Sequence, residues 1–214
     1  MKKSFLFLIV AVTATIQIPL VNAQADPCAN PTHIMGPEQI GIGGTSGNDV
    51  IKGNDLNNRI WAKGGDDIVC GGGGNDYIHG ADGNDELYGQ DGNDLLYGAN
   101  HADLLDGGNG RDVLFGMYGP DTIHGGDVDD VIFEGESDQV EGDLTIGTAF
   151  GGPGDDYIQG GDGVDILHGD DGNDVVLGGA AEGTLTGGSG NDYLDGGPGT
   201  DHCTTDPDPA VNCP

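Results

Sequence analysis

The stretch GGGGNDYIH at residues 71–79 decides how this chain folds, because nearly the same pattern returns at residues 187–195 as GGSGNDYLD. In both stretches glycines precede an aspartate, and an aliphatic side chain stands two positions after that aspartate. Glycine adopts positive φ angles without a steric penalty, so the glycine-rich part predicts a tight turn. The last three residues alternate between the two faces, which predicts a very short strand. One copy of the pattern is therefore one turn followed by one strand.

This unit repeats every nine residues over most of the chain. Between positions 49 and 130 every ninth residue is an aspartate except Asn58, and an aliphatic residue always follows two positions later. The interval then slips, with Asp138 eight positions after Asp130, and the nine-residue spacing resumes at Gly147. A fixed short period is the signature of a solenoid. The side chains predicted to form its core are Ile51, Ile60, Val69, Ile78, Leu87, Leu96, Leu105, Leu114, Ile123, Ile132, Val140, Ala149, Ile158, Leu167, Val176, Leu185, Leu194 and Cys203.

Two units together make one flattened coil. About nine such coils, stacked at the strand separation of roughly 4.8 Å, give a body about 40 Å long. The fold class that we predict is all-β, a parallel β-roll (β-solenoid) of stacked 18-residue coils with two nonapeptides per coil. Stacking places alternate aspartates above one another, so that Asp67 shares one edge with Asp85, and Asp76 shares the other edge with Asp94.

Carboxylates stacked about 5 Å apart repel one another unless a cation lies between them. Glycine turns leave backbone carbonyl oxygens exposed, and a flexible, all-oxygen ligand set suits Ca²⁺ better than Mg²⁺, which needs a stricter octahedron. We therefore predict multiple Ca²⁺ ions. The expected metal ligands are Asp49, Asp67, Asp76, Asp85, Asp94, Asp103, Asp112, Asp121, Asp130, Asp156, Asp165, Asp174, Asp192 and Asp201.

The aliphatic side chains cannot stabilise the coils alone. Ordering the backbone costs roughly 1–2 kcal/mol per residue, whereas burying the single Leu or Ile of a repeat returns only about 1.5–3 kcal/mol. Metal binding must therefore contribute to folding. We predict a disordered, expanded chain without Ca²⁺ and a rigid β-roll with it.

Composition excludes several other functions. Six Lys and Arg residues against 37 Asp and Glu residues give a formal net charge of −31, so the chain lacks the basic face that nucleic acids and anionic membranes require. No HExxH, G-x-S-x-G or P-loop motif occurs, and we expect no catalytic residues. An EF-hand needs a glutamate at position 12 of its loop and a helix on each side, and the sequence indicates neither.

The pattern G-G-x-G-x-D-x-aliphatic-x, as it stands at residues 71–79 and 187–195, resembles the RTX family, the haemolysin-type calcium-binding nonapeptide repeats. The resemblance covers about three quarters of the chain. It implies a calcium-loaded β-roll and a bacterial origin. Relatives often carry a protease, lipase or epimerase domain beside the roll, but residues 24–43 and 204–214 are too few to fold as one.

The first residues indicate export. Lys2 and Lys3 precede an apolar stretch that begins at Phe5, and Ala23 provides a small residue at the cleavage position. We expect a signal peptide cleaved after Ala23 and a secreted, extracellular protein. An uncleaved membrane anchor is the alternative, although the stretch is shorter than the roughly 20 residues that a span needs. Relatives usually leave the cell through an uncleaved C-terminal signal, so this chain departs from the family there.

Four cysteines, an even number, favour disulfides in an exported protein. Three pairings are possible, and free thiols are the alternative. We favour Cys28–Cys70 and Cys203–Cys213, because each would fasten one end of the repeats. The segments that we expect are a signal peptide at 1–23, an N-terminal cap at 24–43, repeat blocks at 44–133 and 151–203, an irregular insertion at 134–150 and a tail at 204–214.

Some repeats depart from the pattern. Asn58 replaces an acid, and we expect the first coil to be a cap with weak or no calcium sites in which Trp61 packs. His101 and Val128 occupy glycine places, which puts their turns in doubt. Two acidic positions hold glycine instead, Gly147 and Gly183, and these predict gaps in the stacked acids. Acids expected to face solvent from the middle of a turn are Asp82, Asp91, Asp162 and Asp171.

Three functions are compatible with these features. The first is a secreted calcium-binding repeat protein with a structural or interaction role. The second is a ligand-binding roll, either adhesin-like or ice-binding, although threonine does not recur as an ice-binding ladder requires. The third is a hydrolase or toxin fragment with an active site near residues 134–150. Calcium is the one partner that the residues identify.

Overall fold

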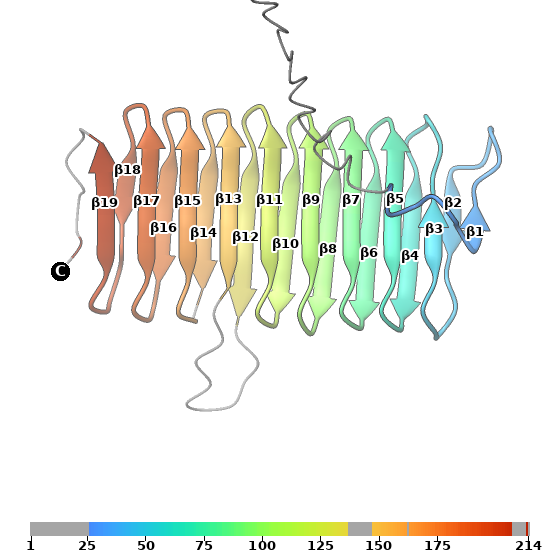
Figure 1. Cartoon of the computed structure of the whole chain (residues 1–214), viewed down its shortest axis with the longest axis horizontal. Helices are drawn as coiled ribbons and strands as arrows, with labels where there is room; N and C mark the ends of the chain where they lie inside the picture. Colours follow the sequence, from blue (N-terminus) through green and yellow to red (C-terminus); the bar gives the residue numbers. More distant parts are fainter. Residues whose placement is uncertain (1–25, 137–146, 162, 207–212, 214) are drawn as a thin grey trace, which may run out of the picture.

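A computed structural model describes residues 26–136, 147–161, 163–206 and 213 of the chain. It is a two-sheet parallel β-solenoid, as predicted, in which successive strands alternate between the sheets (Figure 1). The first sheet contains β1 (His33–Ile34), β3 (Val50–Lys52), β5 (Ile68–Gly73), β7 (Glu86–Asp91), β9 (Leu104–Asn109), β11 (Thr122–Asp127), β13 (Thr148–Pro153), β15 (Ile166–Asp171), β17 (Thr184–Ser189) and β19 (His202–Asp206). The second contains β2 (Gly41–Gly43), β4 (Arg59–Gly64), β6 (Tyr77–Asp82), β8 (Leu95–Asn100), β10 (Val113–Tyr118), β12 (Val131–Glu136), β14 (Tyr157–Gly161), β16 (Val175–Gly179) and β18 (Tyr193–Asp195).

Each coil takes up two nonapeptides, as the doubled repeat predicts. In the first sheet Val69 of β5 pairs with Leu87 of β7, and Leu87 pairs with Leu105 of β9. The part of the chain that the structure describes contains no helix with the length and apolar character needed to cross a bilayer.

The core is a single stripe of aliphatic side chains between the two sheets. Each strand from β3 to β18 contributes one such residue, and these side chains have 0–1 % of their surface exposed. Two further residues, Met35 and Ala62, join the stripe near the N-terminal end. All described members of the predicted core take part, with Cys203 partly buried against it, while Val140 lies outside the described residues.

Most strands are longer than predicted, because they include the first glycines of the pattern. β6, for example, spans six residues, and both Ile78 and Gly80 face inward while their neighbours face outward. A strand that continues past the aliphatic residue brings the next inward position to the edge of the core. Glycine at that position leaves room for an aspartate side chain.

The expected insertion at 134–150 is narrower in the structure. β12 continues to Glu136 and β13 begins at Thr148, so both ends of the predicted irregular segment are strand. Thr122 of β11 pairs with Thr148 of β13, and these two residues are separated by more than the two repeats that separate most other paired positions. The additional residues therefore leave the stacking of coils undisturbed, and Asp138 lies outside the described residues. At the C-terminal end, β19 extends past residue 203 into the expected tail.

Aromatic rings form a ladder on the outer face of the second sheet. Trp61 stacks on His79 with ring centroids 4.7 Å apart, Tyr97 stacks on Phe115 at 4.8 Å, and Phe115 stacks on Phe133 at 4.9 Å. The expectation that Trp61 packs within the first coil is wrong: the side chain is 51 % exposed on this ladder. In-register stacking brings identical strand positions of adjacent coils together, which places the rings face to face.

Both favoured disulfides are present. Cys28 is bonded to Cys70 with Cα atoms 6.3 Å apart, and Cys203 is bonded to Cys213 with Cα atoms 6.2 Å apart. The first joins the N-terminal segment to β5, and the second joins β19 to the end of the chain. The predicted signal peptide at 1–23 lies outside the described residues.

Candidate metal centre

The predicted ligands lie in two columns, one along each edge of the roll, where the chain crosses from one sheet to the other. All of them are buried except Asp201, which is half-buried. Column 1 precedes the strands of the first sheet and contains Asp49, Asp67, Asp85, Asp103, Asp121, Asp165 and Asp201. Column 2 precedes the strands of the second sheet and contains Asp76, Asp94, Asp112, Asp130, Asp156, Asp174 and Asp192.

Backbone amides hold one oxygen of most column aspartates. In column 2 the N–H of Asp76 donates to Oδ1 of Asp94 at 2.7 Å, and the N–H of Asp94 donates to Oδ1 of Asp112 at 2.7 Å. In column 1 the N–H of Asp85 donates to Oδ1 of Asp103 at 2.8 Å. Hydrogen bonds to a carboxylate are short and strong, so they fix the direction of each side chain. The repeat pattern alone did not predict this ladder.

In most column aspartates the second carboxylate oxygen is buried without a hydrogen bond. Among the described residues no donor reaches it. Burying an ionised oxygen without a partner is costly, and such an atom in a native fold calls for an explanation such as an ion. The atoms concerned are Oδ2 of Asp67, Asp76, Asp85, Asp94, Asp103, Asp112, Asp121, Asp130, Asp156, Asp174, Asp192 and Asp201.

A glycine, which we call the first glycine, stands five positions before every column aspartate except Asp67 and leaves space beside this oxygen. A Cβ on Gly71 would clash with Oδ2 of Asp76 and lie 2.8 Å from the carbonyl oxygen of Gly89 in the next coil. A carboxylate oxygen and a backbone carbonyl oxygen thus border one small space that only glycine keeps open. The same pair of oxygens borders the first glycines Gly80, Gly89, Gly107, Gly125, Gly151, Gly160 and Gly169.

This donor set fits calcium. Nowhere in the described ranges do three His, Cys, Asp or Glu side chains converge on one point, so a side-chain cage of the kind that zinc uses is not formed there. Each turn offers a carboxylate oxygen together with backbone carbonyl oxygens. Ca²⁺ accepts six to eight oxygen ligands, including backbone carbonyls, in a flexible geometry.

Comparison with known families agrees with the geometry. A family model described as the RTX calcium-binding nonapeptide repeat (4 copies) matches residues 43–78, 71–105, 79–114, 106–135, 150–185 and 177–207, which is more than half of the chain. The chain belongs to the RTX calcium-binding repeat family. The matched segments leave out residues 136–149, where the register of the RTX roll shifts. No curated protein matches the chain.

Burial dominates the electrostatics of the RTX columns. Loss of water raises the pKa of Asp103 and Asp130 to about 8 and that of Asp76 to about 7, against the opposing effect of the backbone hydrogen bonds. Repulsion between stacked carboxylates, from which we predicted the cation sites, is a smaller cause. The same burial raises the pKa of Asp121 and Asp156 to about 7 and of Asp67, Asp85, Asp94, Asp112 and Asp174 to about 6.

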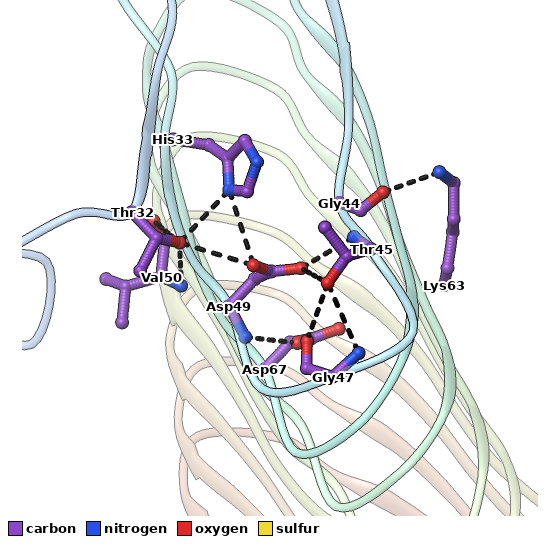
Figure 2. Close-up of polar contacts among 9 residues, drawn as sticks. All are labelled: Thr32, His33, Gly44, Thr45, Gly47, Asp49, Val50, Lys63 and Asp67. Carbon is purple, nitrogen blue, oxygen red and sulfur yellow. Dashed lines mark hydrogen bonds and ion pairs between the residues drawn. The ribbon is translucent and has the colours of Figure 1, made fainter.

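Asp49 ends column 1 and differs in its hydrogen bonds from Asp67, the next aspartate of the column (Figure 2). Its Oδ2 accepts hydrogen bonds from the backbone N–H of Thr45 at 2.6 Å and from the Thr45 hydroxyl at 2.9 Å. Its Oδ1 lies 3.4 Å from Nδ1 of His33 and 3.4 Å from the hydroxyl of Thr32. Although desolvation acts to raise it, these hydrogen bonds and the His33 charge lower the pKa of Asp49. Protein donors therefore satisfy this carboxylate, whereas Oδ2 of Asp67 below it accepts no hydrogen bond from a described residue.

The first turn of column 2 is also satisfied by protein groups. Asn58 accepts a hydrogen bond from the N–H of Asn54 at 2.9 Å and donates from Nδ2 to Oδ1 of Asn54 at 2.9 Å. In column 1, the first-glycine position before Asp67 holds Ala62, which is buried. The ammonium group of the next residue, Lys63, donates to the carbonyl oxygen of Gly44 (Figure 2). These contacts support the interpretation of the first coil as a cap.

The two turns that lack a glycine form nevertheless. His101 and Val128 adopt the left-handed conformation with φ of 81° and 86°. The aspartates that follow them, Asp103 and Asp130, remain buried in their columns. The N–H of Val128 donates to the carbonyl oxygen of Pro153 in the next coil at 2.6 Å, which helps to hold a conformation that a valine rarely adopts.

The mid-turn acids face solvent, as predicted. Asp82 and Asp91 are exposed, and each accepts a hydrogen bond from an asparagine one coil further on, Asn100 at 2.7 Å and Asn109 at 2.8 Å. Asp171 is likewise exposed, and Asp162 lies outside the described residues. These side chains form an outer ladder that is separate from the buried columns.

Of the two gaps that we expected in column 1, at Gly147 and Gly183, the one at Gly147 is filled by another side chain. A Cβ on Gly147 would overlap Oε1 of Glu134, whose carboxylate occupies this place. Glu134 has only 3 % of its surface exposed. Sequence reasoning missed it because Glu134 stands at a first-glycine position, where the repeat pattern has no acid.

Proposed function

We propose that this protein is a secreted calcium-binding repeat protein that folds on binding multiple Ca²⁺ ions between successive turns and has a structural or interaction role. The observation that carries the proposal is the buried Oδ2 of the column aspartates. Most of these oxygens have no hydrogen-bond donor among the described residues, and first glycines such as Gly71 and Gly89 keep a space open beside the aspartate five positions later.

The column aspartates would supply the carboxylate oxygens, and the first glycines of the next coil would supply carbonyl oxygens. In column 2, Asp94 is held by the N–H of Asp76, and its Oδ2 borders the same space as the carbonyl of Gly107. A bound calcium ion supplies positive charge to carboxylates that have lost their water. Backbone N–H groups of the adjacent coil donate to these carboxylates and fix their orientation.

Calcium binding would stabilise the folded state because the ligands come from different coils. The unfolded chain presents no preformed site, so the free energy of binding adds to the free energy of folding. The core gives only one aliphatic side chain per strand, and the formal net charge is −31. Both features favour an expanded chain when no cation is present.

Secretion is supported by the signal-like residues 1–23 and by two disulfides, which persist in oxidising compartments. Calcium is abundant outside cells, which suits a protein that requires it for folding. One disulfide fastens the N-terminal segment to β5 and the other fastens β19 to Cys213, so they would protect the two ends of the roll.

The experiment that tests the proposal compares the chain in Ca²⁺ with the chain in EGTA. We expect circular dichroism to show β-structure with calcium and a disordered spectrum without it, and calorimetry to show binding of several ions. An identical spectrum in both conditions would rule out calcium-dependent folding, and the absence of binding would rule out the calcium sites.

Asp94→Asn and Asp82→Asn form a matched pair for this experiment, because both remove one carboxylate from neighbouring turns. Asp94 is buried in column 2, whereas Asp82 is exposed on the outer ladder. We expect D94N to weaken calcium binding and to lower the thermal stability of the calcium-bound protein, and D82N to change neither. Equal effects of the two substitutions would show that calcium interacts with overall acidity instead of with the columns.

A further inference from the structure

Glu134 occupies a position that the fold otherwise gives to glycine. It lies in β12 between Phe133 and Gly135, which pair in register with strands on both sides. Its counterparts in the adjacent strands are the first glycines Gly116 and Gly160, beside Asp121 and Asp165. A charged side chain at this inward position is unexpected, yet Glu134 is buried with 3 % of its surface exposed.

Gly147 shows the reverse exchange. It stands at the acidic position of column 1, since the N–H of the following Thr148 donates to the carbonyl of Asp121 at 2.9 Å, as in every regular turn. A Cβ on Gly147 would overlap the Oε1, Cδ and Cγ atoms of Glu134. The acid and the glycine of this turn have therefore changed places, and the glutamate fills the volume that an aspartate at 147 would use.

Glu134 also takes over the hydrogen bond of the missing aspartate. In the regular part of column 1, the N–H of Asp103 donates to Oδ1 of Asp121 at 3.0 Å. The N–H of Asp121 should next meet a carboxylate at position 147, and it acts instead as a hydrogen-bond donor to Glu134. The carboxylate of Glu134 is close enough to Asp121 and Asp165 for their charges to act on it.

An unsatisfied oxygen belongs to Asp121, the preceding aspartate of the column. Oδ2 of Asp121 is buried and accepts no hydrogen bond from a described residue. It borders the first glycine Gly116, and the carbonyl oxygen of Glu134 borders the same glycine. Glu134 thus contributes a backbone oxygen to the space beside Asp121 and a carboxylate to the next position of the column.

We propose that the carboxylate of Glu134 is a calcium ligand that replaces the aspartate missing at 147 and keeps column 1 continuous between Asp121 and Asp165. This inference rests on the proposed calcium-binding function and adds a ligand outside the nonapeptide pattern. The second gap gives an internal contrast. At Gly183 the corresponding first-glycine position holds Gly178, which brings no side chain to the place of the acid. Column 1 therefore has a carboxylate at the first gap and lacks one at the second.

The test compares calcium stoichiometry in the wild-type chain, E134Q and the exchange variant E134G/G147D, measured by calorimetry and by flow dialysis with radioactive calcium. Glutamine keeps the volume and an oxygen for the Asp121 amide but removes the charge. We expect E134Q to lose one bound ion or to bind one ion at least tenfold more weakly. The exchange variant returns the acid to the usual position, and we expect wild-type stoichiometry. E38Q, which removes an exposed carboxylate from the N-terminal segment, is the control and should bind as the wild type does.

The outcomes separate the two proposals. If the wild-type chain binds no calcium, the proposed function fails. If the wild-type chain binds calcium and E134Q binds the same number of ions with the same affinities, the role of Glu134 as a ligand is wrong. If E134Q does not fold, the exchange variant decides: wild-type stoichiometry supports the inference, and a persistent loss of one ion overturns it.

Discussion

Asp130 donates its backbone N–H to Oδ1 of Asp156 at 2.7 Å, although 26 residues separate them where other column neighbours are 18 residues apart. Column 2 therefore passes the register shift between β12 and β13 without a break. The carboxylates on both sides remain buried and equally placed. The eight additional residues between these positions therefore do not divide the roll into two bodies.

Deleting residues 139–146 should therefore preserve the roll. The deletion restores the usual two-repeat offset between β11 and β13, and shortening the connection between two strands changes the closure entropy only slowly. We expect wild-type calcium stoichiometry and a melting temperature within about 5 °C of wild type, measured by calorimetry and by circular dichroism. Loss of more than one bound ion would mean that the deleted residues contribute to the columns.

Acidification should promote folding of the calcium-free chain. Burial raises the pKa of Asp103 and Asp130 to about 8, above the unfolded value near 3.9. Between these values the folded state binds more protons than the unfolded state, so its stability rises as the pH falls from about 8 to about 4. With EGTA present, β-structure should therefore be greater at pH 5 than at pH 8. With calcium present the order should reverse, because protons compete with the ion for the same oxygens.

Asp130→Asn is the control for the pH experiment, because asparagine occupies the same kind of position at Asn58. The calcium-free variant should be more folded than wild type at pH 8 and should change less on acidification. A variant that keeps the full pH response would show that other groups control it.

The sequence predicted the architecture and the two columns because they depend on periodicity alone. An aliphatic residue at a fixed place in each repeat determines the core, and an acid at a fixed place determines the columns. Leu96 and Asp94, for example, lie where the spacing puts them. Periodicity could not predict what happens at a position where the pattern is broken, because such a position depends on its spatial neighbours.

Glu134 and Trp61 illustrate that difference. Glu134 is one position in β12, and its partner Gly147 follows the register shift, so only the folded chain brings the two together. Trp61 was expected to pack in the first coil, but it stacks on His79 because outward positions of adjacent coils align. The backbone N–H donors to the carboxylates could not be predicted either, because nearly every residue carries an N–H group and the sequence does not show which of them meets a carboxylate.

A methyl group at a first glycine should disturb the sites. In Gly89→Ala the new Cβ would clash with Oδ2 of Asp94 and lie 2.5 Å from the carbonyl oxygen of Gly107. Overpacking of this kind costs about 1–3 kcal/mol in the free energy of unfolding, and we expect calcium to bind more weakly as well. Chemical denaturation and calorimetry measure the two effects.

Gly36→Ala is the matched control, because no atom lies within 4 Å of a Cβ placed there. It should change the free energy of unfolding by less than about 0.5 kcal/mol. If G89A were as well tolerated as G36A, the space beside Asp94 would not be required.

Replacing Val128 by glycine should stabilise the protein. Val128 has a φ of 86° and is 44 % exposed, so its side chain contributes little packing in return for a strained backbone. Relief of strain is worth about 1–3 kcal/mol, and the added freedom of glycine in the unfolded chain costs about 0.5–1 kcal/mol. We expect a net gain of about 1 kcal/mol from these two opposing effects. His101→Gly should gain less, because histidine tolerates this conformation better than a β-branched residue does, and thermal melts of the two variants will show the order.

The aromatic ladder should contribute to stability independently of calcium. Phe115 stacks on Tyr97 and on Phe133 with ring centroids 4.8 and 4.9 Å apart. Each aromatic pair is worth about 0.5–1.5 kcal/mol beyond its buried area, so Phe115→Ala should lower the free energy of unfolding by about 1–3 kcal/mol without changing the number of bound calcium ions. Leu177→Ala is the control, because Leu177 holds the same outward strand position beyond the ladder, and it should cost less. A change in calcium stoichiometry in F115A would show instead that the outer face and the columns are coupled.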